Sequence, residues 1–170
     1  MIQTRAVKVE PVATARLLLC PLTVEVAGAI VGGEPGPGRS WAEGYPGVAD
    51  VAVAGRAVRR WVEEGDPGVF GAYEIRLLGS RLAIGGIGFH GPPDEIGVVT
   101  VGYGLVPSER GKGYASEALR ALVEAARRAG ASGVKGDADL DNPPSHRVME
   151  AAGMRCVAED DKLRHFYVSL

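Results

Sequence analysis

The sequence has little cysteine, little net charge and no long apolar run, and each shortage excludes a class of protein. Its two cysteines, Cys20 and Cys156, lack metal-binding spacing, so neither a disulfide framework nor a metal site is expected. The net charge of −2 provides no general positive field for nucleic acid. No apolar run approaches the roughly 18 residues of a membrane span, and residues 1–10 have no signal-peptide core. We therefore expect a cytoplasmic protein that binds neither membranes nor nucleic acid.

Glycine and proline are abundant instead, with 25 and 11 residues among the 170 of the chain. They predict many turns, and the length predicts a single domain over residues 1–170. The densest cluster, residues 32–47, is expected to be a loop, although its Trp41 and Tyr45 are unusual in a plain linker. One interpretation is that these two rings hold the loop against the core.

Residues 98–129 carry the clearest signal in the sequence. Residues 98–106 are mostly β-branched, aromatic or apolar, as in a buried strand, and Pro107 should end that strand. From Ala115 onward, apolar residues recur at helical spacing. The turn between them, Arg110-Gly111-Lys112-Gly113, offers backbone N–H groups, a helix N-terminus and two cations, and its glycines can adopt positive φ. A turn without a ligand is the alternative, but the cations favour a phosphate or pyrophosphate site.

Hydrophobic periodicity and turn residues divide the rest of the chain into helices and strands. Thr23 and Asp50 are expected N-caps, and Asn142 should cap a third helix by accepting from the Ser145 amide, because two prolines intervene. The expected strands are 15–22, 70–78, 81–89, 95–106, 133–138, 154–158 and 163–169, and the expected helices are 24–31, 50–64, 115–129 and one from Asn142 to Gly153.

A second glycine-rich stretch, residues 86–91, matches the dinucleotide pattern G-x-G-x-x-G. Two prolines follow it where a phosphate-binding helix would have to begin, so we reject a dinucleotide site. The glycines of this strand are better explained by twist or a bulge. A nucleotide-binding domain is therefore disfavoured.

Residues 110–115 fit the pattern Arg/Gln-x-x-Gly-x-Gly/Ala and resemble the acyl-coenzyme A loop of the GCN5-related N-acetyltransferase (GNAT) superfamily. Their flanks, 102–107 and 115–118, and the opening phrase 14–23 resemble the branch of ribosomal-protein N-terminal acetyltransferases. The resemblance covers essentially the full chain and implies an α/β fold with a central mixed sheet. In that fold two parallel strands, here 98–106 and 133–138, splay apart between flanking helices.

The resemblance implies an N-acetyltransferase that moves an acetyl group from acetyl-CoA to a primary amine of a small molecule or protein N-terminus. It places residues 32–47 on the acceptor side, so Trp41 and Tyr45 would shape the substrate pocket. A serine resembling Ser145 has been given the role of general acid in the branch. The cofactor-binding residues implied are Tyr103, Gly104, Leu105, Val106, Arg110, Gly111, Lys112, Gly113, Tyr114, Ala115, Asn142 and Ser145.

Two positions depart from the family pattern. Many members have a tyrosine that acts as general acid for the thiolate where this chain has Met149. The branch often has a glutamate, a candidate general base, where this chain has Thr100. A non-catalytic acyl-CoA-binding or sensing module is therefore the alternative function. The general base stays open among four residues, and no base is required if the acceptor amine arrives partly neutral. Family members often dimerise, so a homodimer is allowed. These four candidate bases are His90, Asp94, Glu95 and Asp139.

Overall fold

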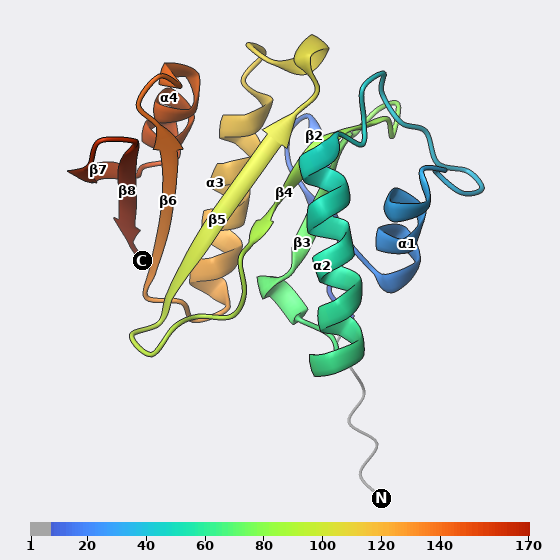
Figure 1. Ribbon diagram of the computed structural model, residues 1–170, viewed down its shortest axis with the longest axis horizontal. Coiled ribbons are helices and arrows are strands. Elements are labelled where there is room, and N and C mark those ends of the chain that lie inside the picture. The colour runs from blue at the N-terminus through green and yellow to red at the C-terminus, as the bar shows by residue number, and fades with distance from the viewer. Residues whose placement is uncertain (1–7) are drawn as a thin grey trace, which may run out of the picture.

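The computed structural model describes residues 8–170, which form one mixed sheet flanked by helices (Figure 1). The strand order is β1-β2-β3-β4-β5-β6-β8-β7, and among these strands only β5 and β6 pair in parallel. The strands are β1 Val12–Ala13, β2 Leu17–Pro21, β3 Ala72–Leu77, β4 Ala83–Phe89, β5 Val98–Leu105, β6 Gly133–Asp139, β7 Arg155–Glu159 and β8 Leu163–Ser169. The α-helices are α1 Val24–Gly32, α2 Val48–Glu64, α3 Tyr114–Arg128 and α4 Pro143–Ala151, and the 3-10 turns are η1 Gly68–Phe70 and η2 Pro107–Glu109.

The expected α/β fold and the expected order of elements are confirmed, with β1 as an unpredicted addition. Thr23 and Asn142 cap their helices through the predicted side-chain oxygens. The predicted cap at Asp50 is wrong. Gly47 is the N-cap of α2, and Asp50 lies three residues inside, where its Oδ2 accepts from the Gly47 amide at 2.9 Å. The error arises because Asp is favoured both at the cap and in the reciprocal position one turn later.

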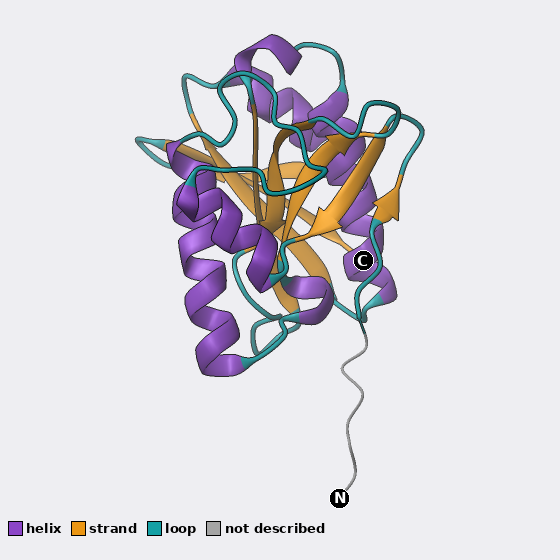
Figure 2. Cartoon of the chain, turned by 90° about the vertical axis from the view of Figure 1, so that its right-hand side faces the viewer, coloured by secondary structure: helices purple, strands orange, loops and turns teal. Residues whose placement is uncertain are grey.

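Helices cover both faces of the sheet (Figure 2). The pair α1 and α2 packs on one face of the first half of the sheet, whereas α3 and α4 pack on the other face (Figure 1). None of the helices in residues 8–170 is long and apolar enough to cross a membrane.

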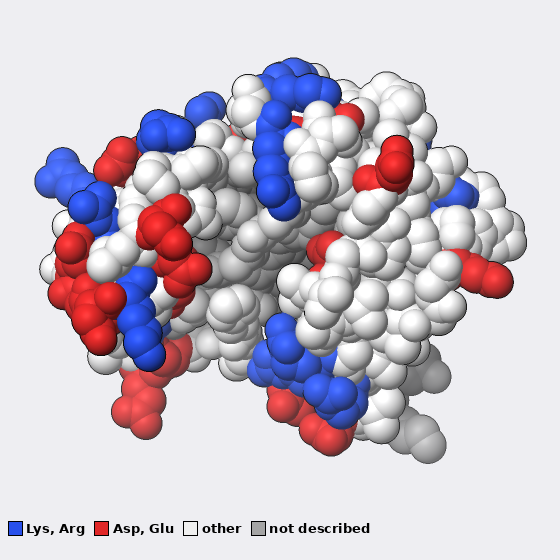
Figure 3. All heavy atoms as spheres, turned by 45° about the horizontal axis from the view of Figure 1, so that its top comes forward, with Lys and Arg blue, Asp and Glu red and all other residues white. Residues whose placement is uncertain are grey.

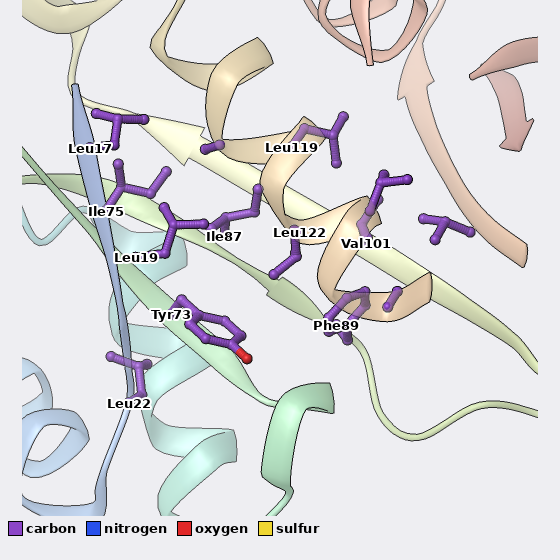
Figure 4. Close-up of a cluster of buried hydrophobic side chains, with 14 of the residues drawn as sticks. Leu17, Leu19, Leu22, Tyr73, Ile75, Ile87, Phe89, Val101, Leu119 and Leu122 are labelled. Atoms are coloured by element: carbon purple, nitrogen blue, oxygen red, sulfur yellow. The ribbon is translucent and has the colours of Figure 1, made fainter. Parts of the chain in front are cut away.

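One layer of the apolar core lies between the sheet and α3 (Figure 4), and a smaller one lies under α1 and α2. Alternate residues of the strands face α3, because side chains of a strand point to opposite faces in turn. Leu119 and Leu122, on the apolar stripe of α3, meet this face and are fully buried. Each such side chain stabilises the fold by about 1.5–3 kcal/mol. The strand side chains that face α3 include Leu17, Leu19, Ile75, Ile87 and Val101.

The parallel pair β5 and β6 is joined over only three residue pairs. Val98, Val99 and Thr100 pair with residues 133–135, and no further pair follows. Beyond this point β5 stays bonded to β4 as far as Leu105, while β6 stays bonded to β8. The strands therefore diverge toward their carboxyl ends, as Figure 1 shows, and the expected splay is confirmed.

Close packing of β4 against β5 generates a stability prediction. A methyl group on Gly85 would collide with the backbone carbonyl of Gly104, whereas a methyl on Gly28 in α1 would meet nothing within 4 Å. We expect Gly85→Ala to lower the free energy of unfolding by about 1–3 kcal/mol. We expect Gly28→Ala to raise it by up to about 1 kcal/mol, because alanine favours a helix interior. Urea unfolding of both variants checks this, and equal effects would contradict it.

Candidate active site

The turn between β5 and α3 presents a row of unused backbone donors. Gly111 and Gly113 have φ values of +75° and +83°, so both glycines adopt the positive φ that their residue type allows. Among hydrogen bonds between described residues, none uses the amides of residues 111–116. These amides surround the N-terminus of α3, where the helix dipole is positive. The turn therefore has the geometry of an anion site.

The two cations of the turn are held beside it. Arg110 Nε donates to the Leu105 carbonyl at 3.0 Å, and Lys112 Nζ pairs with Glu109 Oε2 at 3.0 Å. Figure 3, in which the top of the view in Figure 1 comes forward, shows Lys and Arg side chains above a central hollow in this face. Both cations keep exposed surface, so they can also neutralise an anion at the turn.

A brace from the start of β2, which the sequence patterns did not predict, holds this turn in place. Arg16 donates to the Lys112 carbonyl at 2.8 Å and to Glu117 Oε2 at 2.7 Å. Its guanidinium carbon lies 4.5 Å from the centre of the Tyr114 ring. Thr14 Oγ1 and the Arg16 amide both donate to Glu117 Oε1, at 2.6 and 2.8 Å. The only sequence signal for these contacts is an acidic residue in the first turn of α3.

A cleft of about 650 Å³ runs from this turn to α4. It brings together ten of the twelve predicted cofactor-binding residues. Lys112 does not line it, and neither does Val106, which is buried and donates its amide to the Ile84 carbonyl at 2.9 Å. The predicted residues that line the cleft are Tyr103, Gly104, Leu105, Arg110, Gly111, Gly113, Tyr114, Ala115, Asn142 and Ser145.

Two hydroxyl groups meet across the splay. Tyr103 Oη lies 2.6 Å from Ser145 Oγ and donates to the Ser145 carbonyl at 3.2 Å. Burial raises the pKa of Tyr103 and outweighs the opposing effect of its hydrogen bond with Ser145, so the phenol stays protonated at neutral pH. Met149 is only 1% exposed and packs away from this cleft. The cleft thus contains a proton-carrying pair supplied by β5 and α4.

A second cavity, of about 450 Å³, lies on the α2 side of the sheet. It shares four lining residues with the first cleft, so the two spaces meet at the end of β5. The loop before α2 contributes Tyr45, which lines the cavity, packs edge-on against Trp41 and donates to Glu74 at 3.0 Å. Tyr45 is also buried. Its position therefore fits both a ring that holds the loop against the core and a ring that shapes the substrate pocket. The shared residues are Tyr103, Gly104, Leu105 and Arg110.

The four candidate bases are scattered. Only His90 lines the second cavity, next to Gly102. Asp94 accepts from the Ile96 and Val98 amides in the turn before β5, and Glu95 is exposed in that same turn. Asp139 is the last residue of β6. In residues 8–170 no group of three or more His, Cys, Asp or Glu side chains could hold a metal ion.

Comparison with known proteins identifies the family of this chain. A family model described as an acetyltransferase (GNAT) domain matches residues 16–155, which include Arg16, the turn and the whole of α4. The chain belongs to the acetyltransferase (GNAT) family. The family resemblance noted in the sequence is therefore confirmed.

Individual relatives agree with this family. The uncharacterized N-acetyltransferase YjdG of Bacillus subtilis (strain 168) is 32% identical over 84 residues, or 49% of this chain. The matched segment spans about half the length of that relative, at 50%. The crystal structure of ribosomal-protein-S5-alanine acetyltransferase from Vibrio fischeri has a TM-score of 0.71 at 15% identity, covering 94% of this chain and 96% of that one. The acetyltransferase MccE, solved in complex with acetyl-CoA and AMP, has a TM-score of 0.66 at 12% identity, covering 92% and 94%.

The brace generates a prediction about acid stability. Burial alone would raise the pKa of Glu117, but hydrogen bonds from Thr14 and Arg16 outweigh it and lower the pKa. The ionised carboxylate therefore stabilises the fold fully above its ordinary pKa, and this contribution disappears as pH falls through the lower folded value. We expect Glu117→Gln to cost about 1–3 kcal/mol at pH 7. Urea unfolding should show the difference in unfolding free energy between variant and wild type closing as pH falls below the ordinary pKa of a glutamate.

Glu124→Gln is the matched control on the same helix. Glu124 forms exposed pairs with Arg127 and Arg128, at 3.2 and 3.0 Å, which contribute little in water. We expect its effect to stay within about 0.5 kcal/mol at every pH. Equal losses in the two variants would mean that the brace does not stabilise the fold.

Proposed function

We propose that this chain is an acetyl-CoA-dependent N-acetyltransferase, which transfers an acetyl group to a primary amine of a small molecule or a protein N-terminus. The observation that carries the proposal is the meeting of two cavities at the end of β5. Only one cavity reaches the turn glycines Gly111 and Gly113, so the other is left for a second substrate, as a two-substrate transfer requires. The family membership and the N-acetyltransferase relative support the same reaction.

The chain offers two sets of backbone groups to acetyl-CoA. The free amides of residues 111–116 would bind the pyrophosphate, with Arg110 and Lys112 adding positive charge. The edge of β5 beyond Thr100 has lost its parallel partner, so its N–H and C=O groups can pair with the amides of the pantetheine arm. MccE, of the same fold, was solved with acetyl-CoA bound, which is consistent with this use of the splay.

Acetyl-CoA supplies an activated acyl group, and coenzyme A leaves as a thiol. The chain must therefore provide a proton to the departing sulfur. Tyr103 and Ser145 lie in the cleft within hydrogen-bond distance of each other. In our proposal Ser145 Oγ donates the proton and Tyr103 supplies a replacement through their 2.6 Å contact. Met149 stands where many family members have their tyrosine acid. In this chain a phenol reaches the cleft from β5 instead of α4, so that loss does not leave the cleft without a proton donor.

The anion site is tested by Gly113→Glu. The side chain would point at Arg16 Nη2, 3.2 Å from the added Cβ, and would add a negative charge where the pyrophosphate is expected. We expect acetyl-CoA affinity to fall by at least about a hundredfold in calorimetry. The control Gly130→Glu has the same kind of backbone strain, with φ of +89° at the other end of α3, and should bind acetyl-CoA normally.

Normal binding by Gly113→Glu, or equal loss in both variants, would contradict the assignment of the turn. No binding of acetyl-CoA by the wild-type chain would remove the proposed function altogether.

The proton donor is tested by Ser145→Ala. We expect turnover to fall about tenfold to a hundredfold, with the acetyl-CoA dissociation constant within about twofold of wild type. Thiol release measures the first quantity and calorimetry the second. Ser108→Ala is the control, because Ser108 is exposed in η2 and makes no side-chain hydrogen bond with another described residue. Unchanged turnover would mean that Ser145 is not the donor.

The same assay separates an enzyme from an acyl-CoA-sensing module. Thr100 and Met149 motivate the sensing alternative, since neither replaces the ionisable group of the family pattern. A sensing module would bind acetyl-CoA tightly yet release no thiol with any amine of a broad panel. Measurable thiol release with one amine would exclude that alternative.

A further inference from the structure

The second cavity has a floor without side chains. On the face of the sheet toward α2, Gly86 pairs with Gly104, and Gly88 pairs with Gly102. All four glycines line the cavity. Gly104 is the most informative of them, because an added Cβ would meet nothing within 4 Å and its backbone is not in the left-handed region. Packing within residues 8–170 therefore does not require glycine there, and the open space is available to a ligand.

One carboxylate lies directly above this glycine floor. Asp50, from the first turn of α2, has its Oδ1 atom 3.0 Å from where a Cβ on Gly86 would lie. Its Oδ2 atom is held by the Gly47 amide at 2.9 Å, whereas Oδ1 makes no hydrogen bond with any described residue. Because adjacent strands lie about 5 Å apart, Oδ1 stands roughly one strand from Gly104, where the two cavities join.

The neighbouring acid, Glu74, already has its own partners. Glu74 is 1% exposed and accepts from Arg76 Nε at 2.6 Å and from the Tyr45 hydroxyl at 3.0 Å. Asp50 forms no ion pair among residues 8–170. Its surroundings disfavour the ionised form: burial raises the pKa of Asp50, and the charge of Glu74 adds to this despite the Gly47 hydrogen bond. The described residues offer this buried carboxylate no cationic partner, so a cationic ligand would stabilise its ionised form.

The rest of the lining restricts what that ligand can be. Apart from Asp50 the walls are mainly apolar, with Arg110 and His90 among the few side chains that can carry charge. A volume of about 450 Å³ suits a small molecule or the first residues of a peptide. The cavity therefore matches a cationic head on a slim apolar stem. The apolar lining includes Leu22, Ile30, Val48, Ala49 and Val53.

We propose that Asp50 binds the protonated primary amine of the acceptor over the glycine floor and takes its proton before acetyl transfer. This inference rests on the proposed function and names its acceptor class: a primary ammonium group on a slim, apolar stem. Such a group occurs in alkylamines and at protein N-termini that begin with a small residue. Asp50 is thus assigned as a catalytic residue, in addition to its hydrogen bond with Gly47.

The proton and electron balance is simple. One N–H proton passes from the ammonium group to Asp50 Oδ1, and the freed nitrogen lone pair forms a C–N bond to the thioester carbonyl carbon. The C–S bond breaks, and sulfur keeps its electron pair. The nitrogen releases a second proton to water as the amide forms, while sulfur gains one from Ser145. Water then restores the proton that the Ser145–Tyr103 pair has given up. Asp50 returns its proton to water, so each turnover releases one proton.

The test is Asp50→Asn, which keeps an oxygen for the Gly47 amide and removes the charge. The probes are n-hexylamine and a tetrapeptide amide that begins Ala-Ala, which distinguish the two sources of amine. We expect wild type to acetylate at least one probe, and the variant to lose at least about a hundredfold in kcat/KM with unchanged acetyl-CoA affinity. Asp66→Asn is the control, since Asp66 also caps a backbone amide, that of Gly68 at 2.8 Å, outside the cavity. It should stay within about twofold of wild type.

Thermal unfolding separates catalysis from structure. The folded pKa of Asp50 lies above its ordinary value, so at neutral pH the ionised carboxylate opposes folding, and Asp50→Asn should leave Tm unchanged or raise it. A lower Tm with a parallel loss of activity would indicate a structural role and overturn the inference. So would full activity of the variant, or acetyl-CoA binding by wild type without acetylation of either probe. Failure of wild type to bind acetyl-CoA would instead overturn the proposed function itself.

Discussion

The short pairing of β5 with β6 is the constraint on which the rest of the site depends. After three residue pairs the strands separate, yet each is held on its other edge, β5 by β4 and β6 by β8. The separation therefore leaves backbone N–H and C=O groups facing one another without opening the core, which α3 covers from behind. Such groups need partners, and an extended ligand that carries amides supplies them in the manner of an added strand. The turn with free amides, both cavities and the Tyr103–Ser145 contact all lie at this end of β5.

A ligand bound in this gap is useful only if the start of α3 stays in place. Arg16 provides that, because it joins the Lys112 carbonyl and Glu117 to the beginning of β2, which is itself paired on both edges, with β1 and β3. The turn is thus shaped before any ligand arrives, and little ordering has to accompany binding. The same contacts explain why a helix N-terminus with few side-chain caps is stable: the amides at its tip are left free, while the carboxylate one turn later takes the hydrogen bonds from outside.

Sequence patterns predicted what local interactions determine. The caps at Thr23 and Asn142 and the turn glycines depend on neighbours within a few residues, and so do the strands that pair as hairpins. What the patterns missed depends on distant parts of the chain. Arg16 and Glu117 are 101 residues apart, and nothing in either local sequence indicates the other. Asp50 was expected as a cap for a sound local reason, but its place in the cavity is decided by glycines on β4 and β5. The two-residue β1 exists through its pairing with β2 and has no pattern of its own.

The proposed chemistry divides its two proton transfers between opposite faces of one strand. Asp50 lies on the α2 side of β5, where the acceptor would lose a proton, and Tyr103 with Ser145 lies on the other side, where the thiol would gain one. A side chain at Gly104 would stand between them, and the absence of one leaves the nitrogen a direct approach to the carbonyl carbon. Keeping the groups apart also matters electrostatically, because a carboxylate next to the departing thiolate would oppose the charge that develops there. The departures from the family pattern at Thr100 and Met149 are therefore compatible with catalysis: the same two tasks are given to residues that the fold, and not the local sequence, brings to the end of β5.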